Sequence, residues 1–416
     1  MATCFRFTLA LFACAVGVFC LPAAAQVLDA TQPLQYVPLG VPCRAVDTRD
    51  THTPIPGGTF RNFSPGSGGC SIDTSAGGPI AYALNVTALP RGPLDTLTVW
   101  PAGEPQPLAS TLNSYDGRIK ANAAIVAGGA NGQVSVFMSN TADLILDVSG
   151  YFVPTKPPVF TYTFFPLTPC RVVDTRNNDG TQFGAPFLAA GHQRDFVFSL
   201  SSCNLPPDPW EAGGAFSLNV TVIPRNGKPV GHVTVWGTSH THPDPPLAST
   251  INDPTGTVVA NAAIVAVNPG YTGSVSVFTT DDTDVAIDVN GYFALFFKPG
   301  GLSLYTLTPC RILDTRSTTQ AFQGERTIPV TTGNNCSVSG TAKAYVFNAT
   351  VLPVKTLGFL TLWQDGLPRP TASTLNAEDG AAASNMAIVG TTNGSIDAFA
   401  DLPTQLILDT SGYFAP

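Results

Sequence analysis

Three copies of one short motif hold the residue types in this chain that could do chemistry. The motif is Cys-Arg-x-x-Asp-Thr-Arg, and its copies begin at Cys43, Cys170 and Cys310. A thiol beside a guanidinium group is a candidate nucleophile. A carboxylate beside arginines forms an ion pair, and several such oxygens together bind a cation. Whether the motif forms a reactive site or has a structural role depends on the elements that carry it.

The motif cysteines are predicted to form disulfides. Outside residues 1–25 the chain has six cysteines, two in each repeat. The rival interpretation is a metal site, but these lone cysteines lack the close spacing that zinc prefers. A disulfide closing a loop of this length contributes roughly 3–4 kcal/mol to stability. The expected pairs are Cys43 with Cys70, Cys170 with Cys203, and Cys310 with Cys336.

Residues 1–25 are predicted to be a secretory signal peptide. They contain an early positive charge at Arg6, an apolar run, and the small residues Ala23 and Ala25 before Gln26. A membrane anchor is the alternative, but the run is short for a span and no charged stop follows it. We therefore expect a secreted or cell-surface protein with no membrane span in the mature chain.

The composition is typical of an exported β-protein. Charged residues make up 12% of the chain, which is about half the usual globular share. Glycine and proline are abundant, with 39 and 37 residues, and the formal net charge is −8. No surface basic enough to follow a phosphate backbone is expected, which argues against nucleic acid as a partner.

The chain repeats itself at the length of a domain. After each motif come, in the same order, segments resembling "AYALNVTALP", "LTVW", "LASTLN", "ANAAIVAGG", "GQVSVF" and "LILDVSGYF". We place module 1 at 27–154, module 2 at 157–296 and module 3 at 300–416, joined by short linkers stiffened by proline. The repeats leave no room for a separate catalytic domain.

Each module is predicted to be built of strands. In 81–90, Tyr82, Leu84 and Val86 fall on one face while Asn85 and Thr87 fall on the other, which is the period of a strand. The closing segment is continuously apolar, as in a central strand covered on both faces. Frequent turn residues predict an all-β fold of three tandem β-sandwich modules, jelly-roll-like, with one disulfide each. A closed barrel is the lesser alternative.

Strand alternation places Asp47 and Arg49 on one face of the motif and Arg44 on the other. Asp147 lies in the apolar closing strand, where an unpaired carboxylate would be costly. We therefore predict a structural ion-pair network that sets strand register. Its members are Arg44, Asp47, Arg49 and Asp147 in module 1, Arg171, Asp174, Arg176 and Asp288 in module 2, and Arg311, Asp314, Arg316 and Asp409 in module 3.

A calcium site is the functional alternative for this network. Asp47, Asp147 and nearby asparagine oxygens would be its ligands. Adjacent guanidinium groups make a cation unfavourable there, so the structural interpretation is preferred and no metal is predicted.

No catalytic residue is predicted. The five histidines do not recur at equivalent positions, and neither a G-x-S-x-G nor an H-E-x-x-H motif is present. His240 and His242, with Asp244, could contact a metal but lack a clear partner set. We expect a protein that is not an enzyme and has no cofactor. The three-residue segments that begin at Asn85, Asn219 and Asn348 match the N-glycosylation pattern. An alternative that fits them equally well is a ladder of hydrogen-bonded Asn and Thr side chains.

Recurring tryptophans are the candidate ligand-binding residues. Trp100, Trp236 and Trp363 each end a predicted strand and precede a loop that differs between the copies. An exposed indole beside a variable loop could stack on a sugar ring. Packing in the core is the commoner fate of a tryptophan on a strand.

Together, "PCRxxDTR", "LNVT", "VW…ASTLN", "ANAAIV" and "DVSGYF" resemble modules of secreted bacterial proteins that occur in tandem or beside other extracellular domains. The resemblance covers all three repeats and implies a bacterial, extracytoplasmic setting, but it transfers no catalytic or binding residue. We expect a non-catalytic structural or adhesive protein. The alternative is a carbohydrate-binding protein in which three weak sites act together. A surface protein or a polysaccharide is the partner that these functions imply.

Overall fold

The computed structural model describes residues 32–416, except 67–68, 71, 73–79, 155–159, 206–213, 240–243, 271–272, 296–297, 318–320 and 333. The predicted signal peptide and the pair His240 and His242 lie outside the described residues. Within them the regular structure consists of strands, with short 3-10 turns between some of them. The all-β prediction is confirmed.

Module 1 is a sandwich of two four-stranded sheets. One sheet has the order β1-β8-β3-β6 and the other β2-β7-β4-β5. The strands are β1 (Leu34–Asp47), β2 (Thr59–Phe63), β3 (Ala81–Pro90), β4 (Leu94–Pro101), β5 (Leu112–Ser114), β6 (Lys120–Ala127), β7 (Val134–Met138) and β8 (Ala142–Pro154).

Module 2 repeats this topology strand for strand. Its sheets have the orders β9-β16-β11-β14 and β10-β15-β12-β13. The strands are β9 (Tyr162–Asp174), β10 (Gln193–Val197), β11 (Gly214–Pro224), β12 (Val230–Gly237), β13 (Ile251–Asp253), β14 (Val259–Val267), β15 (Ser274–Thr279) and β16 (Thr283–Leu295).

Module 3 has the same pairing, but its last two strands are one long strand, β23. Numbered within a module, the sheets run 1-8-3-6 and 2-7-4-5, which is the strand order of a jelly roll. The jelly-roll prediction is therefore correct. The strands are β17 (Ser303–Asp314), β18 (Phe322–Pro329), β19 (Ala344–Pro353), β20 (Leu357–Gln364), β21 (Leu375–Ala377), β22 (Ala383–Gly390) and β23 (Ser395–Ala415).

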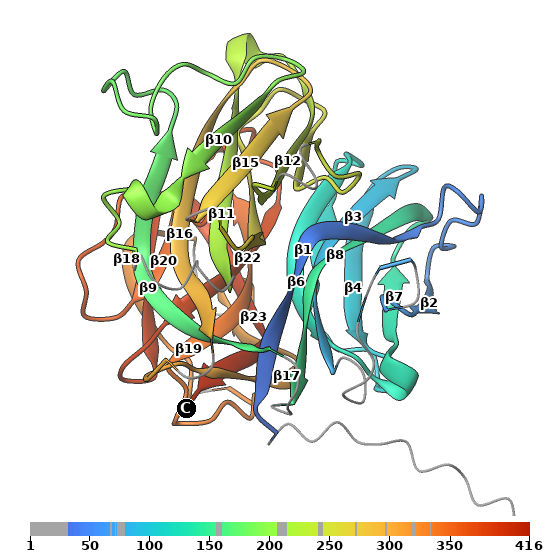
Figure 1. The fold of residues 1–416 in the computed structure, drawn as a ribbon. Coiled ribbons are helices and arrows are strands. Elements are labelled where there is room, and N and C mark those ends of the chain that lie inside the picture. Colours follow the sequence, from blue (N-terminus) through green and yellow to red (C-terminus); the bar gives the residue numbers. More distant parts are fainter. Residues whose placement is uncertain are drawn as a thin grey trace, which may run out of the picture.

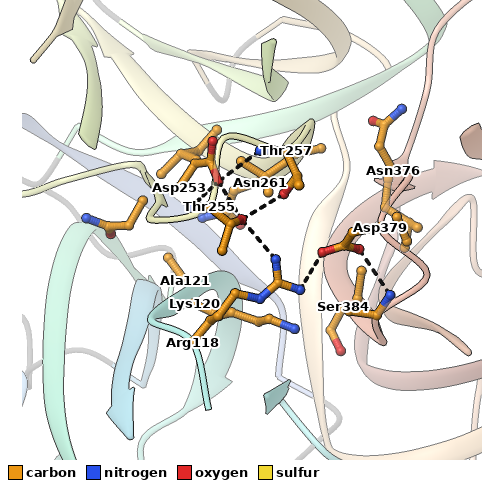
Figure 2. A pocket seen from close by; sticks show the side chains of 18 of the residues that line it. Arg118, Lys120, Ala121, Asp253, Thr255, Thr257, Asn261, Asn376, Asp379 and Ser384 are labelled. Carbon is orange, nitrogen blue, oxygen red and sulfur yellow. Dashed lines mark hydrogen bonds and ion pairs between the residues drawn. The ribbon is translucent and has the colours of Figure 1, made fainter. Parts of the chain in front are cut away.

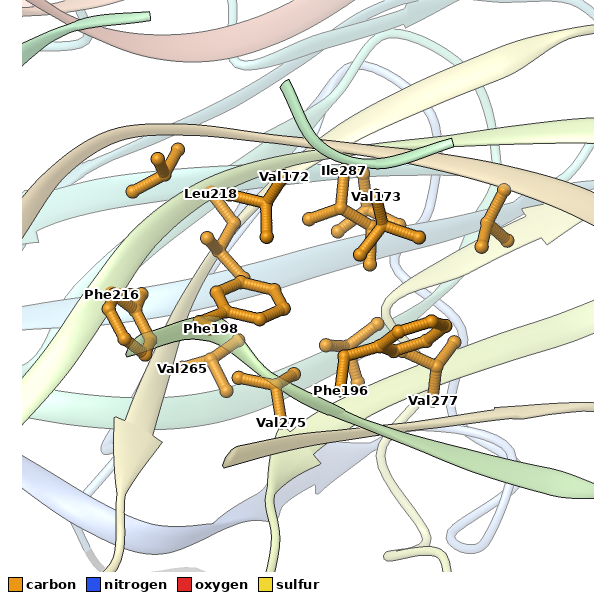
Figure 3. Packing of buried hydrophobic residues seen from close by; sticks show 14 of the residues in the cluster. Val172, Val173, Phe196, Phe198, Phe216, Leu218, Val265, Val275, Val277 and Ile287 are labelled. Atoms are coloured by element: carbon orange, nitrogen blue, oxygen red, sulfur yellow. The ribbon is translucent and has the colours of Figure 1, made fainter. Parts of the chain in front are cut away.

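Each sandwich encloses its own apolar core. Figure 3 shows that of module 2, where Phe216 and Leu218 of β11 pack with Phe196 and Phe198. In module 1 the predicted alternation holds, because Tyr82, Leu84 and Val86 all belong to the core between the sheets. The three predicted disulfides are present, with Cα atoms 5.6, 5.8 and 5.7 Å apart.

The three modules are joined around a common axis (Figure 1). Their first strands meet: β1 pairs with β9 at Tyr36 and Tyr162, and with β17 at Leu34 and Leu304. In each module, the sheet that contains the first strand is called the inner sheet. The three inner sheets thereby join into one continuous hydrogen-bonded array. A fourth apolar cluster, built from all three modules, fills the space between those sheets.

Three equivalent phenylalanines mark the axis. Phe152, Phe293 and Phe414 close the three modules, and their ring centroids lie 6.2, 6.5 and 6.1 Å from one another. Tyr36 packs on Phe152 at 5.0 Å. This packing requires a glycine in the "SGYF" segment, because a Cβ on Gly150 would lie 2.2 Å from the Tyr36 hydroxyl. The modules are thus arranged with approximate threefold symmetry.

Candidate functional site: the motif network at the module boundaries

The motif arginine is the start of a polar row that crosses three strands of the inner sheet. In module 1, Arg44 of β1 lies opposite Asp147 of β8, and Asp147 lies opposite Asn85 of β3. Adjacent positions in register share one face of a sheet. The same rows recur as Arg171, Asp288 and Asn219 in module 2, and as Arg311, Asp409 and Asn348 in module 3.

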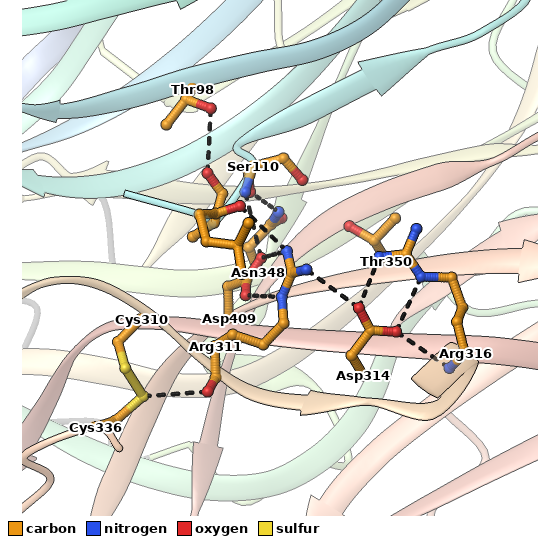
Figure 4. Close-up of polar contacts among 12 residues, drawn as sticks. Thr98, Ser110, Cys310, Arg311, Asp314, Arg316, Cys336, Asn348, Thr350 and Asp409 are labelled. Carbon is orange, nitrogen blue, oxygen red and sulfur yellow. Dashed lines mark hydrogen bonds and ion pairs between the residues drawn. A yellow bond between two sulfur atoms is a disulfide. The ribbon is translucent and has the colours of Figure 1, made fainter. Parts of the chain in front are cut away.

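The ion pairs expected from the sequence are present in all three modules. Figure 4 shows module 3, where Nε and Nη2 of Arg311 donate to Asp409 at 2.8 and 3.1 Å, and Nη1 donates to Asp314 at 3.2 Å. The side chain of Arg316 forms two further bonds with Asp314, at 2.6 and 2.9 Å. Arg44, Asp47, Arg49 and Asp147 form the equivalent network in module 1, and Arg171, Asp174, Arg176 and Asp288 in module 2.

The predicted distribution of the motif over two faces is wrong. The register of β1 against β8 shifts between Arg44 and Val46, so Ala45 has no partner of its own. A bulge of this kind breaks the alternation of side chains. It lets Arg44 reach Asp47, three residues later, at 3.4 Å. The equivalent shift in module 3 lies between Arg311 and Leu313.

The carboxylates of the network have two different environments. Asp147 and Asp288 are 2% and 1% exposed, and this burial raises the pKa of each, against the bonds from Arg44 and Arg171. Asp47, whose side chain is 3% exposed, is paired with both Arg44 and Arg49. The hydrogen bond from Arg49 lowers its pKa below the usual value, because that bond favours the ionised form.

The motif threonine fixes the start of the closing strand. Thr48 Oγ1 donates to Asp143 at 2.8 Å and accepts the backbone N–H of Leu144 at 2.9 Å. Thr175 forms the same pair of bonds with Asp284 and Val285. All polar side chains of the motif therefore have structural partners. The oxygens proposed for calcium in Asp47 and Asp147 contact guanidinium groups instead.

The polar rows also join each module to the next. At the boundary of modules 2 and 3, Asn219 Nδ2 donates to the backbone oxygen of Ser373 at 2.6 Å. Asn385 Nδ2 donates to Asn219 Oδ1 at 2.7 Å. The N–H of Ser373 donates to Asp288 at 3.2 Å. Residues repeated in the "LNVT", "AST" and "SNMA" segments thus meet across a boundary.

The same contacts close a cycle of three boundaries. Module 1 meets module 2 through the bonds of Asn85 with Ser249 and Asn261, and module 3 meets module 1 through those of Asn348 with Ser110 and Asn122. The asparagine ladder exists, but it runs between modules rather than along one sheet. The amide nitrogens of Asn85, Asn219 and Asn348 are engaged there, so the glycosylation alternative does not fit the fold.

One arginine connects all three modules at one end of the axis. Arg118 of module 1 contacts Asp379 of module 3 at 2.5 Å and donates to Thr255 of module 2 at 3.0 Å (Figure 2). Nearby, Lys120 Nζ donates to the backbone oxygen of Ala382 at 2.8 Å. Sequence reasoning missed Arg118, because neither of the other modules has an arginine at this position.

The three tryptophans are core residues, and the prediction that they present a stacking surface is wrong. Trp100, Trp236 and Trp363 are 2%, 0% and 0% exposed. The indole N–H of Trp100 donates to the backbone oxygen of Glu104, and that of Trp363 to Leu367, both at 2.8 Å. The loop after each of these two strands therefore folds back over the indole and secures it.

No known protein-family model matches the chain, and no curated protein is significantly similar to it. In the described part of the chain, no group of three or more His, Cys, Asp or Glu side chains is arranged to hold a metal ion. None of the described helices is long and apolar enough to cross a membrane.

Proposed function

We propose that this chain is a non-catalytic secreted or cell-surface protein that serves as a structural or adhesive block. One observation carries the proposal: the polar residues that recur in every copy are used within the fold. The motif arginines and aspartates pair with each other, and the recurring asparagines join the modules. Residues repeated for a shared reaction would instead converge on an accessible pocket.

The features that stabilise the assembly support the same proposal. Three disulfides, four apolar clusters and a closed cycle of boundaries stabilise one chain. Disulfides of this kind persist in oxidising, extracellular surroundings. The low share of charged residues, 12%, is also consistent with extensive burial between modules.

The loops that differ between the copies would make the contacts with a binding partner. The loops after Trp100 and Trp363 contain exposed residues such as Gly103, Gln106 and Arg369. These two loops have equal length but different sequences, while equivalent strands precede them. Loops on a rigid scaffold are common sites of recognition.

Surface labelling of intact cells of the source organism, followed by fractionation, tests the proposed location. The protein should be labelled by an impermeant biotin reagent and recovered in the medium or the envelope fraction. Beads coated with the folded protein should then adhere to those cells more than beads coated with reduced, unfolded protein. A cytoplasmic location, or equal adhesion of both kinds of bead, would refute the proposal.

A further inference from the structure

The boundary between modules 2 and 3 contains an open groove of about 770 Å³. One wall comes from module 2, with Arg171, Arg176 and Thr221, and the other from module 3, with Phe359 and Glu378. This volume lies within the range of small-molecule sites, which are common where domains meet. Arg171 and Arg176 belong both to the groove and to the motif network of module 2.

This boundary differs from the other two in the size of its side chains. Thr371 lines the groove, whereas the equivalent residues in "PLAST" are Leu108 and Leu247. Ala286 lines it as well, whereas the equivalent residues of the closing strands are Ile145 and Ile407. Smaller residues at two positions make this boundary more open than its counterparts.

A hydrogen bond across the boundary is also absent here. Arg44 Nη2 donates to the backbone oxygen of Leu247 at 3.1 Å, and Arg311 Nη2 to that of Leu108 at 3.5 Å. Among the described residues, the side chain of Arg171 bonds only to Asp288 and Asp174. A guanidinium group has five N–H donors. Arg171 thus keeps donors for a ligand in the groove.

The groove offers donors and acceptors side by side. Arg176 uses Nε and Nη2 to bind Asp174, which leaves Nη1 free of described partners, and its side chain is 52% exposed. Across the groove, Glu378 is exposed, and its carboxylate is able to accept hydrogen bonds. Thr221 also lines the groove, but it is only 3% exposed. Its hydroxyl has no hydrogen-bond partner in the described structure, and neither has the hydroxyl of the equivalent Thr87.

We propose that the groove between modules 2 and 3 binds a neutral oligosaccharide. Each sugar hydroxyl both donates and accepts, so neighbouring hydroxyls suit a guanidinium group on one side and a carboxylate on the other. Phe359 is half-buried, stacked on Phe399 with centroids 5.7 Å apart, and offers an apolar surface to a sugar ring.

The charges of the groove favour a neutral ligand over an acidic one. Asp174 and Asp288 already balance Arg171 and Arg176, and Glu378 adds a negative charge. The whole chain carries a formal charge of −8. An anionic sugar would gain no net attraction at this site. The inference extends the proposed adhesive function to one boundary and one class of ligand.

The test uses the full chain on an array of neutral hexasaccharides, namely gluco-, xylo-, manno-, galacto- and chitohexaose, together with hexagalacturonate. Titration calorimetry then measures the affinity for the best neutral hexasaccharide. Thr371→Leu installs the residue of the other boundaries and narrows the groove. Arg176→Ala removes an exposed donor. Arg176→Ala should weaken binding about tenfold or more, as expected for loss of a charged hydrogen bond. Thr371→Leu should weaken binding to a similar extent, because the larger side chain occupies part of the groove.

Arg49→Ala is the matched control, because Arg49 has the same place in the motif of module 1. It should bind like the parent chain, and its melting temperature should match that of Arg176→Ala. The inference is overturned if no neutral hexasaccharide binds, if hexagalacturonate binds best, or if all variants bind alike. Any of these results leaves the adhesion of coated beads to be judged by its own assay.

Discussion

The side-chain amide of Asn385 lies 2.7 Å from the side-chain oxygen of Asn219, across the boundary between modules 2 and 3. Asn385 is 0% exposed, and its own oxygen accepts the backbone N–H of Ala262 at 2.8 Å. A single side chain thus serves a neighbouring module through both ends of its amide group. The equivalent Asn122 and Asn261 do the same at the other boundaries.

Replacement of this residue should destabilise the protein. Asn385→Ala leaves the oxygen of Asn219 and the N–H of Ala262 without partners in a buried place, at a cost of about 1–3 kcal/mol for each group. Urea unfolding monitored by circular dichroism measures the change. Asn178→Ala, at an exposed loop position, is the control. Equal unfolding midpoints for the two variants would contradict the role given to Asn385.

The buried ion pair of module 3 should be strongly sensitive to truncation. Asp409→Ala leaves Arg311, whose side chain is 17% exposed, without its main partner. Breaking a buried pair in this way typically costs about 3–5 kcal/mol. Asp50→Ala, at an exposed position, should cost far less. Chemical denaturation compares the two.

Chelation provides a separate test of the calcium alternative. EGTA should leave the melting temperature of the intact protein unchanged, because guanidinium groups already occupy the carboxylates. A large drop that added calcium reverses would support a metal site instead.

Acid should remove the contribution of the more exposed motif aspartates. The hydrogen bond from Arg316 lowers the pKa of Asp314 in the folded chain. The stability from this carboxylate is therefore complete above the unfolded pKa of about 4, and is lost as the pH falls through the lower folded value. Asp314→Asn should reduce the difference in unfolding free energy between pH 5 and pH 2. Parallel pH curves for the two proteins would argue against this.

The tryptophans should behave as packing residues. Trp363 is 0% exposed, so Trp363→Ala should cost about 3–5 kcal/mol. Phe160→Ala removes a large side chain that is 72% exposed and should change stability by less than about 0.5 kcal/mol. Thermal denaturation distinguishes the cases. A Trp363→Ala variant as stable as the parent protein would contradict the packing role given to the indole.

The modules should remain together after the chain is cut. A protease site inserted within residues 155–159 allows module 1 to be separated from the rest of the chain. The cut protein should elute at the size of the intact protein in gel filtration, because the boundary contacts and central cluster persist. The pieces should separate in non-reducing SDS, since each disulfide lies within one module. Separation in gel filtration would show that the boundaries are weak.

The fold and the disulfides were predictable because they depend on local rules. Alternation at Tyr82 and Leu84 fixes a core face, and two cysteines per repeat restrict the pairing. The continuous apolar character of the closing segment correctly indicated a strand covered on both faces. That segment contains Phe152, which lies on the axis with its two equivalents.

The boundary contacts could not be predicted from one module at a time. Asn85 lies on the polar face of its strand, which solvent would cover in an isolated sandwich. The available signal was the second face of β3, with Ala81 and Ala83 rather than charged residues. Burial of the tryptophans was the commoner expectation for a strand residue, but the bond from Trp100 to Glu104 could not be foreseen, because it involves a backbone oxygen that sequence patterns do not reveal.

The arrangement of three linked copies around one axis has a consequence for how such a protein can change. In an assembly of three identical chains, any substitution appears at every interface at once. Here each interface is formed by different residues of a single chain. Thr371 therefore stands in place of leucine at one interface, while the other two interfaces keep their leucines. Two boundaries can preserve the assembly while the third is free to acquire a use of its own.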